Sequence, residues 1–183
     1  MFQLDELKNW CRGEVALLIC GSPSAPADVR RSNWESAHWI SVNQHAALLP
    51  DLAWAYAHDP SMIQFLREEI GLTCPIVSPQ FKDLKEKDIY AGICPWVQLS
   101  GPEALWTADY MGYKEIWLCG VDNYENTRRD YWHQYVRPEN DQAFKGKRNP
   151  RKSAWGEIIQ KLRNPKRVKT FNPELNELLR AIR

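Results

Sequence analysis

The stretch VALLICGSPS, residues 15–24, decides the fold class. Val15–Cys20 is a short, uninterrupted apolar run, which is typical of a strand buried on both faces of a sheet. The small and turn-forming residues Gly21–Ser24 follow at once and predict a loop over the carboxyl end of that strand. A buried strand that runs into a short polar loop favours an α/β fold.

Strands and helices alternate along the rest of the chain. Apolar runs predict further strands at residues 38–42, 52–57, 74–77, 115–119 and 167–171. Helices are expected at residues 61–70, 102–111, 153–162 and 173–182, and the charged residues 81–90 are expected to form a surface excursion. This alternation predicts a Rossmann-like α/β fold, with a mostly parallel sheet flanked by helices. We expect residues 1–183 to form a single domain.

The composition is that of a globular protein. Hydrophobic residues make up 44% of the 183 residues and charged residues 26%, so disorder is a poor description of the chain. The five cysteines have no CxxC spacing, which favours buried free thiols in a reducing cytoplasm over a zinc site. The N-terminus does not resemble a signal peptide, and no apolar run approaches the length of a membrane span. We therefore expect a cytoplasmic protein.

Charge is unevenly distributed along the chain. The net charge is only +1, so there is no global electrostatic case for nucleic-acid binding. Acidic residues prevail in residues 1–100, whereas basic residues prevail after them, especially between Arg128 and Lys169. Residues 127–151 are basic and aromatic without a sustained period, which is typical either of a lid over an anion or of a solvated loop. Nucleic acid is a further possible partner of this segment.

Polar residues follow the predicted strands at the points where each strand ends. In parallel sheets, ligands bind outside the carboxyl ends of the strands, so these residues are expected to meet in one crevice. The candidates are Gly21, Ser22, Ser24, Asn43, Gln44, Asp59, Ser100, Gly101, Gly120, Asp122 and Asn123. Their convergence is the main sequence argument for a nucleotide-type ligand.

Each candidate also has an ordinary structural interpretation. The Gly21–Ser24 loop could present N–H groups and hydroxyls to a phosphate or ribose, or it could simply be a turn. Asn43 and Gln44 could bind a base or ribose, or could cap a helix, and the same choice between ligand contact and capping applies to Asp59 and Ser100. Asp59 and Asp122 could be imagined as metal ligands, but their spacing does not support that interpretation.

His133 is the best-placed general base that the sequence offers. It lies in the basic aromatic stretch 128–135, and an imidazole can exchange a proton near neutral pH. The alternative is a surface histidine. His58 adjoins Asp59 near the expected crevice and is a second candidate for ligand contact, whereas His38 and His45 are expected to be structural or surface residues.

Residues 100–126, SGPEALWTADYMGYKEIWLCGVDNYEN, resemble a known family. They are similar to the helix, strand and polar turn of the bacterial lipooligosaccharide sialyltransferases and the related DUF115-type proteins. Weaker matches lie upstream in the same order: the loop after Cys20, then Asn43-Gln44, then Asp59-Pro60. The resemblance implies a Rossmann-like glycosyltransferase that binds a CMP-sugar without a metal or other cofactor and transfers the sugar to an unknown hydroxyl acceptor. The short chain would also suit a phage-encoded relative.

The resemblance also implies roles for individual residues. Asn43 and Gln44 would contact the donor nucleotide, and Ser100 and the Gly120–Asn123 turn would lie along it. Tyr124, together with Tyr131, would donate hydrogen bonds to the leaving phosphate, which gains charge as it departs and needs donors in place of a metal.

This chain departs from the family pattern at two places. Gly21 stands where the family has Asn, and residues 149–153 contain no histidine where the family places its catalytic one. His133 would then take that role. The alternatives are a metal-dependent diphosphokinase of the DUF115 type, with Asp59 and Asp122 holding the metal, or a non-catalytic protein that binds a nucleotide or nucleic acid.

Overall fold

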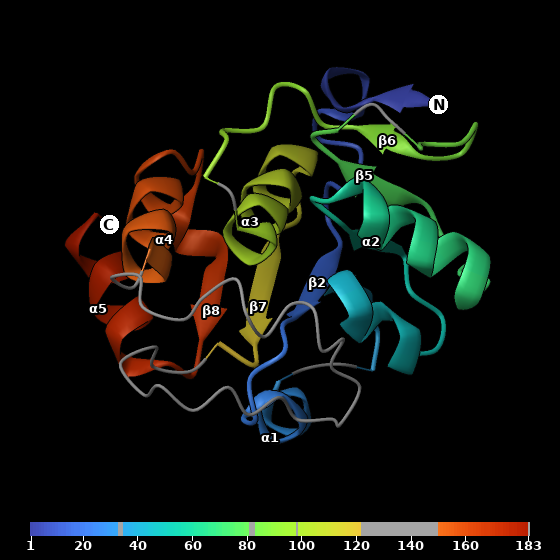
Figure 1. Ribbon diagram of the computed structural model, residues 1–183. Coiled ribbons are helices and arrows are strands. Elements are labelled where there is room, and N and C mark those ends of the chain that lie inside the picture. Colours follow the sequence, from blue (N-terminus) through green and yellow to red (C-terminus); the bar gives the residue numbers. More distant parts are fainter. Residues whose placement is uncertain (33–34, 81–82, 98, 122–149, 183) are drawn as a thin grey trace.

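One parallel sheet of eight strands forms the centre of the protein. The computed structural model describes residues 1–32, 35–80, 83–97, 99–121 and 150–182 (Figure 1). The strand order is β1-β6-β5-β4-β3-β2-β7-β8, and every neighbouring pair is parallel. The strands are β1 Phe2–Gln3, β2 Val15–Ile19, β3 His38–Val42, β4 Trp54–Tyr56, β5 Ile76–Ser78, β6 Ile89–Tyr90, β7 Glu115–Cys119 and β8 Val168–Thr170.

Helices connect the strands. The α-helices are α1 Ala25–Arg31, α2 Pro60–Gln64, α3 Ser100–Met111, α4 Pro150–Gln160 and α5 Pro173–Ala181. Shorter turns are the 3-10 helices η1 Leu4–Leu7, η2 Asn43–Leu48 and η5 Pro165–Arg167, and the π-helical turn η3 Phe65–Glu69, which continues α2. Among the described residues, no helix has the length and apolar character that crossing a membrane requires.

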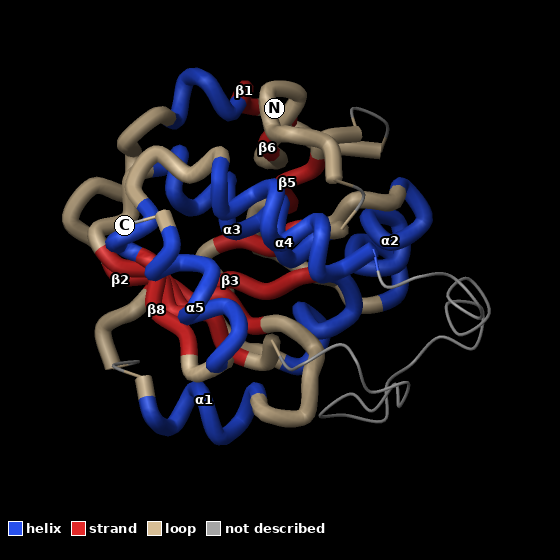
Figure 2. Tube along the Cα trace, turned by 90° about the vertical axis from the view of Figure 1, so that its left-hand side faces the viewer, coloured by secondary structure: helices blue, strands red, loops and turns tan. Residues whose placement is uncertain are grey.

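Side chains of β2 alternate between two helical layers, as the period of two in a strand requires. Ala16 and Leu18 pack in the cluster that contains α3, α4 and α5, whereas Leu17 and Ile19 pack with Ala25 of α1. Farther along the second face, residues of η2, α2 and η3 pack on β4 and β5. Figure 2 shows the strands between α3 and α4 on one side and α1 on the other. The structure confirms the predicted Rossmann-like fold.

The order in which the chain adds strands to the sheet reverses at β2. The strands from β3 to β6 follow one another on one side of β2, and the chain then returns to place β7 and β8 on the other side. In doubly wound sheets, ligands bind outside the carboxyl ends of the strands at the place where the strand order reverses, which here lies at β2 and β7.

The prediction for residues 81–90 was wrong in part. Ile89–Tyr90 is an inner strand, β6, because the preceding Asp88 is completely buried and bound by Arg67 and by the backbone N–H groups of Ile76 and Lys85. The strand was therefore missed because the charged residues before it are typical of a surface segment, although Asp88 is paired and buried. α1 and the short edge strand β1 were also not predicted.

α4 begins at Pro150, three residues before the expected helix start, so the end of the proposed lid at 150–151 is helical. The other residues of the proposed lid, 127–149, lie outside the described part of the chain.

Candidate functional site

A crevice lies at the carboxyl ends of β2, β3 and β7. It is lined by Cys20, Gly21, Ser22, Val42, Asn43, His45, Leu99, Ser100, Gly101, Pro102, Gly120 and Trp155. Its volume of about 120 Å³ is below the roughly 300–1,000 Å³ of typical ligand pockets, so these residues alone can enclose only part of a nucleotide. The crevice brings together six of the residues that the sequence nominated: Gly21, Ser22, Asn43, Ser100, Gly101 and Gly120.

The loops after β2 and β7 are tied together beneath this crevice. The N–H of Ser22 donates to the carbonyl of Gly120 at 3.1 Å, and the N–H of Gly120 donates to the buried carboxylate of Asp28 at 3.0 Å. Gly120 has a φ of +70°, and a Cβ at this position would lie 2.6 Å from both the Cβ of Ala25 and the carbonyl oxygen of Cys20. Only glycine therefore allows the two loops to approach so closely.

A second contact joins the start of η2, directly after β3, to the start of α3. The hydroxyl of Ser100 donates to Oδ1 of Asn43 at 3.1 Å, and Asn43 itself has a φ of +52°. Asparagine is among the few residues that adopt this left-handed conformation readily. Among the residues that the structure describes, none accepts a hydrogen bond from the side-chain Nδ2 of Asn43. That amide group can therefore serve a ligand.

The N-terminus of α3 gives the crevice a positive end. Ser100 and Gly101 lie in the first turn of this twelve-residue helix, where backbone N–H groups have no acceptor within the helix. The aligned peptide dipoles add a partial positive charge, which favours an anion such as phosphate. A Cβ on Gly101 would lie 3.2 Å from the buried Trp155 ring of α4, so glycine keeps this end of the crevice narrow but open.

Three nominated residues are placed outside the crevice lining. The hydroxyl of Ser24 donates to Asp28 at 2.9 Å and thus supports the loop from behind. Gln44 is buried within η2, and Asp59 is exposed at the start of α2, where its backbone carbonyl accepts hydrogen bonds from Met62 and Ile63. Asp122, Asn123, Tyr124, Tyr131 and His133 lie outside the described residues.

The remaining lining residues were not nominated from the sequence: Cys20, Val42, His45, Leu99, Pro102 and Trp155. His45 was expected to be structural or on the surface, yet it lines the crevice although it is largely buried. Trp155 lies on α4, far along the chain from Gly120, the lining residue nearest to it in sequence, and the packing of α4 against α3 brings it there. The position of His45 directly after Asn43-Gln44 was the one signal available.

A buried histidine–carboxylate pair lies at the end of the neighbouring strand β4. Nδ1 of His58 is 2.8 Å from Oε2 of Glu103, a fully buried carboxylate on α3. Glu103 also accepts hydrogen bonds from the hydroxyl of Tyr56 at 3.1 Å and from the N–H of Val97 at 2.9 Å. The hydrogen bond to Glu103 raises the pKa of His58 above 6.5, although burial opposes this shift.

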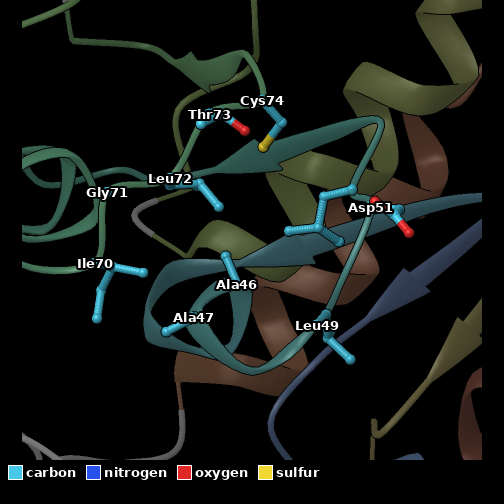
Figure 3. A pocket seen from close by; sticks show the side chains of 10 residues that line it. Ala46, Ala47, Leu49, Asp51, Ile70, Gly71, Leu72, Thr73 and Cys74 are labelled. Atoms are coloured by element: carbon cyan, nitrogen blue, oxygen red, sulfur yellow. The ribbon is translucent and has the colours of Figure 1, made fainter.

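A larger hollow lies at the opposite, amino ends of β4 and β5 (Figure 3). Its volume is about 380 Å³, and its lining includes Leu49, Leu52, Leu72 and Cys74. Asp51 is the one charged residue among those that line it. Polar side chains in this hollow are confined to Asp51, Thr73 and Cys74, whereas Ser22, Asn43, His45 and Ser100 line the smaller crevice beside a helix N-terminus, which makes the smaller crevice the better candidate site. Among the described residues, no group of three His, Cys, Asp or Glu side chains is arranged to hold a metal ion.

The fold is Rossmann-like and sialyltransferase-like. It has eight parallel strands, and the crevice lies where the strand order reverses. The chain is similar to the monofunctional α-2,3-sialyltransferase Cst-I of Campylobacter jejuni, with 15% identity and a TM-score of 0.56 over 86% of this chain and 74% of that chain. The sialyltransferase CstII of Campylobacter jejuni is similar in two complexes, each with 15% identity and a TM-score of 0.55. One holds the substrate analogue CMP-3FNeuAc and covers 87% of this chain and 81% of that one. The other holds cytidine-5'-monophosphate and covers 88% and 81%.

No protein-family model matches the sequence, and no curated protein matches it. At 15% identity the likeness is one of fold.

Proposed function

We propose that this protein is a glycosyltransferase that binds a nucleotide sugar, of the CMP-sugar type, and transfers the sugar to a hydroxyl acceptor without a metal. The observation that carries the proposal is the crevice itself. In it, the N-terminus of α3 and the amide of Asn43 meet at the place where the strand order of the sheet reverses. The CMP and CMP-sugar analogue complexes of the structural neighbour CstII support this choice of ligand.

The described residues suit the phosphate and ribose end of such a donor. The first turn of α3 would receive the negatively charged phosphate, and the side-chain amide nitrogen of Asn43 would bind the ribose or base. Ser22 and Gly21 would line the other wall of the crevice. The small volume is consistent with a site that encloses only this part of the donor.

The remaining roles belong to residues that the sequence nominates. Asp122 and Asn123 would continue along the nucleotide from Gly120. Tyr124 and Tyr131 would donate hydrogen bonds to the leaving phosphate, and His133 is the sequence candidate for the proton acceptor. The basic residues from Arg128 to Arg151 would form a lid over the phosphate. Stabilising the charge that develops on the leaving group is the largest contribution expected from such a site.

A thermal-shift panel tests this proposal. CMP, CDP, UDP, ADP and ATP would be compared, each with magnesium and with a chelator. A nucleotide at about 100 times its Kd adds about 2.7 kcal/mol to the free energy of unfolding, which raises the Tm of a chain of this size by about 5–11 °C. We expect this increase with CMP and in the presence of the chelator.

Other outcomes of the panel favour the alternatives. Stabilisation by ATP that requires magnesium would favour the diphosphokinase. If no nucleotide raises the Tm, the glycosyltransferase proposal is wrong. Salt-dependent binding of oligonucleotides would then favour a nucleic-acid partner for the basic segment.

A further inference from the structure

His58 and Glu103 form a hydrogen-bonded pair that has no role in the function proposed above. His58 follows β4 by two residues, and β4 pairs with β3 so that Tyr56 lies opposite Val42. His58 therefore lies one strand away from Asn43, at the same carboxyl edge of the sheet. Glu103 lies one turn along α3 from Ser100, whose hydroxyl binds Asn43. His58 thus lies at the same edge of the sheet as the crevice, and Glu103 lies on the helix whose first turn lines it, although neither residue lines the crevice itself.

The surroundings of Glu103 hold this carboxylate in place. Its side chain is completely buried, and it receives hydrogen bonds on both oxygens: from Val97 on Oε1, and from Tyr56 and His58 on Oε2. A buried carboxylate is costly unless donors surround it, so this arrangement is a specific feature of the fold and not a surface ion pair. The carboxylate fixes the ring of His58 with Nδ1 as a donor.

With Nδ1 committed to Glu103, the other ring nitrogen of neutral His58 is a proton acceptor. Among the described residues, no partner binds Nε2 of His58. The side chain of His58 is 12% exposed, so a small part of it reaches the solvent. A histidine oriented by a buried carboxylate, with its far nitrogen available, is the arrangement that general-base catalysis requires.

An exposed aromatic ring adjoins this histidine. The indole of Trp96 packs edge-on against the imidazole of His58, with 4.6 Å between ring centroids, and Trp96 is 52% exposed. A large aromatic ring left in solvent beside a reactive group offers a flat apolar face on which the C–H groups of a sugar can pack. Trp96 therefore provides a surface against which a saccharide acceptor can pack.

We propose that His58 is the general base of the transfer reaction, that Glu103 is its positioning residue, and that the acceptor is a saccharide hydroxyl bound against Trp96. This inference rests on the proposed function and assigns to His58 the role that the sequence gives to His133. Nε2 takes the proton of the acceptor hydroxyl while the acceptor oxygen bonds to the anomeric carbon of the donor. The bond from that carbon to the phosphate oxygen breaks, and the nucleotide leaves with the electron pair.

The experiment measures CMP binding and sugar transfer separately. The probes are CMP for binding, and CMP-N-acetylneuraminate with lactose for transfer. The variants are His58→Gln, Glu103→Gln and, as a matched control, His38→Gln. His38 is also a partly buried histidine that hydrogen-bonds through Nδ1, here to the hydroxyl of Tyr113, but it begins β3 at the opposite edge of the sheet.

We expect His58→Gln to lower kcat by about 100-fold or more without changing the affinity for CMP, since general bases contribute about 10²–10⁴-fold. kcat/KM of the wild type should rise with pH through the pKa of His58. Glu103→Gln should move that midpoint to lower pH, because the carboxylate is what raises this pKa. A merely structural role would not shift the pH profile, and His38→Gln should leave it unchanged.

Two results would overturn the inference. If His58→Gln retains the wild-type kcat while His133→Ala loses it, the base is His133. If the wild type binds CMP but transfers no sugar, the pair does not act as a base in this reaction. Failure of the wild type to bind CMP at all is a different result, because it refutes the proposed function on which the inference rests.

Discussion

Replacing Asp28 with alanine should loosen the floor of the crevice. The carboxylate of Asp28 is 6% exposed and accepts hydrogen bonds from the hydroxyl of Ser24 and from the N–H of Gly120. Hydrogen bonds to a charged group each contribute about 1.5–3 kcal/mol, and a buried N–H without a partner costs a similar amount. Ser24 is partly exposed and can turn to water, so the loss at Gly120 dominates. The better helix propensity of alanine offsets about 0.5 kcal/mol. The expected net loss is about 2 kcal/mol.

Urea denaturation followed by tryptophan fluorescence measures this loss, with an expected decrease in Tm of about 4–8 °C in a parallel melt. Asp28→Asn retains one acceptor oxygen and should lose less. Glu86→Ala is the control, because Glu86 is an exposed carboxylate and its removal should change the free energy of unfolding by less than about 0.5 kcal/mol. If Asp28→Ala and Glu86→Ala prove equally stable, the carboxylate does not tie the two loops together.

Three further predictions concern buried charges and thiols. Arg67→Leu should lower the free energy of unfolding by about 3–5 kcal/mol in urea, because it leaves the carboxylate of Asp88 buried without its cation; a loss below 1 kcal/mol would show that the pair is not important for stability. Because its pKa is raised in the folded state, protonated His58 should stabilise the fold below pH 6.5, and this contribution should be lost as pH rises through the folded-state pKa. Denaturation across pH 6–8 should show this loss of stability in the wild type. An equal loss in Glu103→Gln would contradict the prediction. At pH 8 a disulfide reagent should label Cys74 faster than the four buried cysteines, and mass spectrometry of the singly labelled protein would expose a different order of reaction.

Much of the sheet could be predicted from the sequence, because most inner strands are short, mainly apolar runs; β6, within a charged stretch, is the exception. Val15–Ile19 and Glu115–Cys119 are short runs of mainly apolar residues, as expected of strands in a parallel sheet that is covered on both faces. The same logic located the crevice. Parallel strands carry their final residues to one edge of the sheet, and Ser22, Asn43 and Ser100 do line one crevice there.

Contacts between distant charged residues could not be predicted. Glu103 looks like an ordinary polar residue in the first turn of a helix, and only the packing of α3 over β4 buries it against His58. Asp88 likewise lies in a charged stretch of the sequence. In the fold it is buried and paired with Arg67, which lies twenty-one residues earlier. The local sequence pattern does not predict such pairs, because they depend on how distant segments pack in three dimensions.

Binding of CMP at the crevice is the central claim, and calorimetric titration of two glycine variants tests it most directly. Gly101→Val places a branched side chain against the Trp155 ring, where a Cβ alone would lie at 3.2 Å, and it obstructs the first turn of α3. Gly156→Val is the matched control, because a Cβ there meets no atom within 4 Å. The account predicts that the wild type and Gly156→Val bind CMP with similar affinity, whereas Gly101→Val binds at least about tenfold more weakly. Equal binding by all three proteins would place the nucleotide elsewhere, and no binding by any of them would contradict the account.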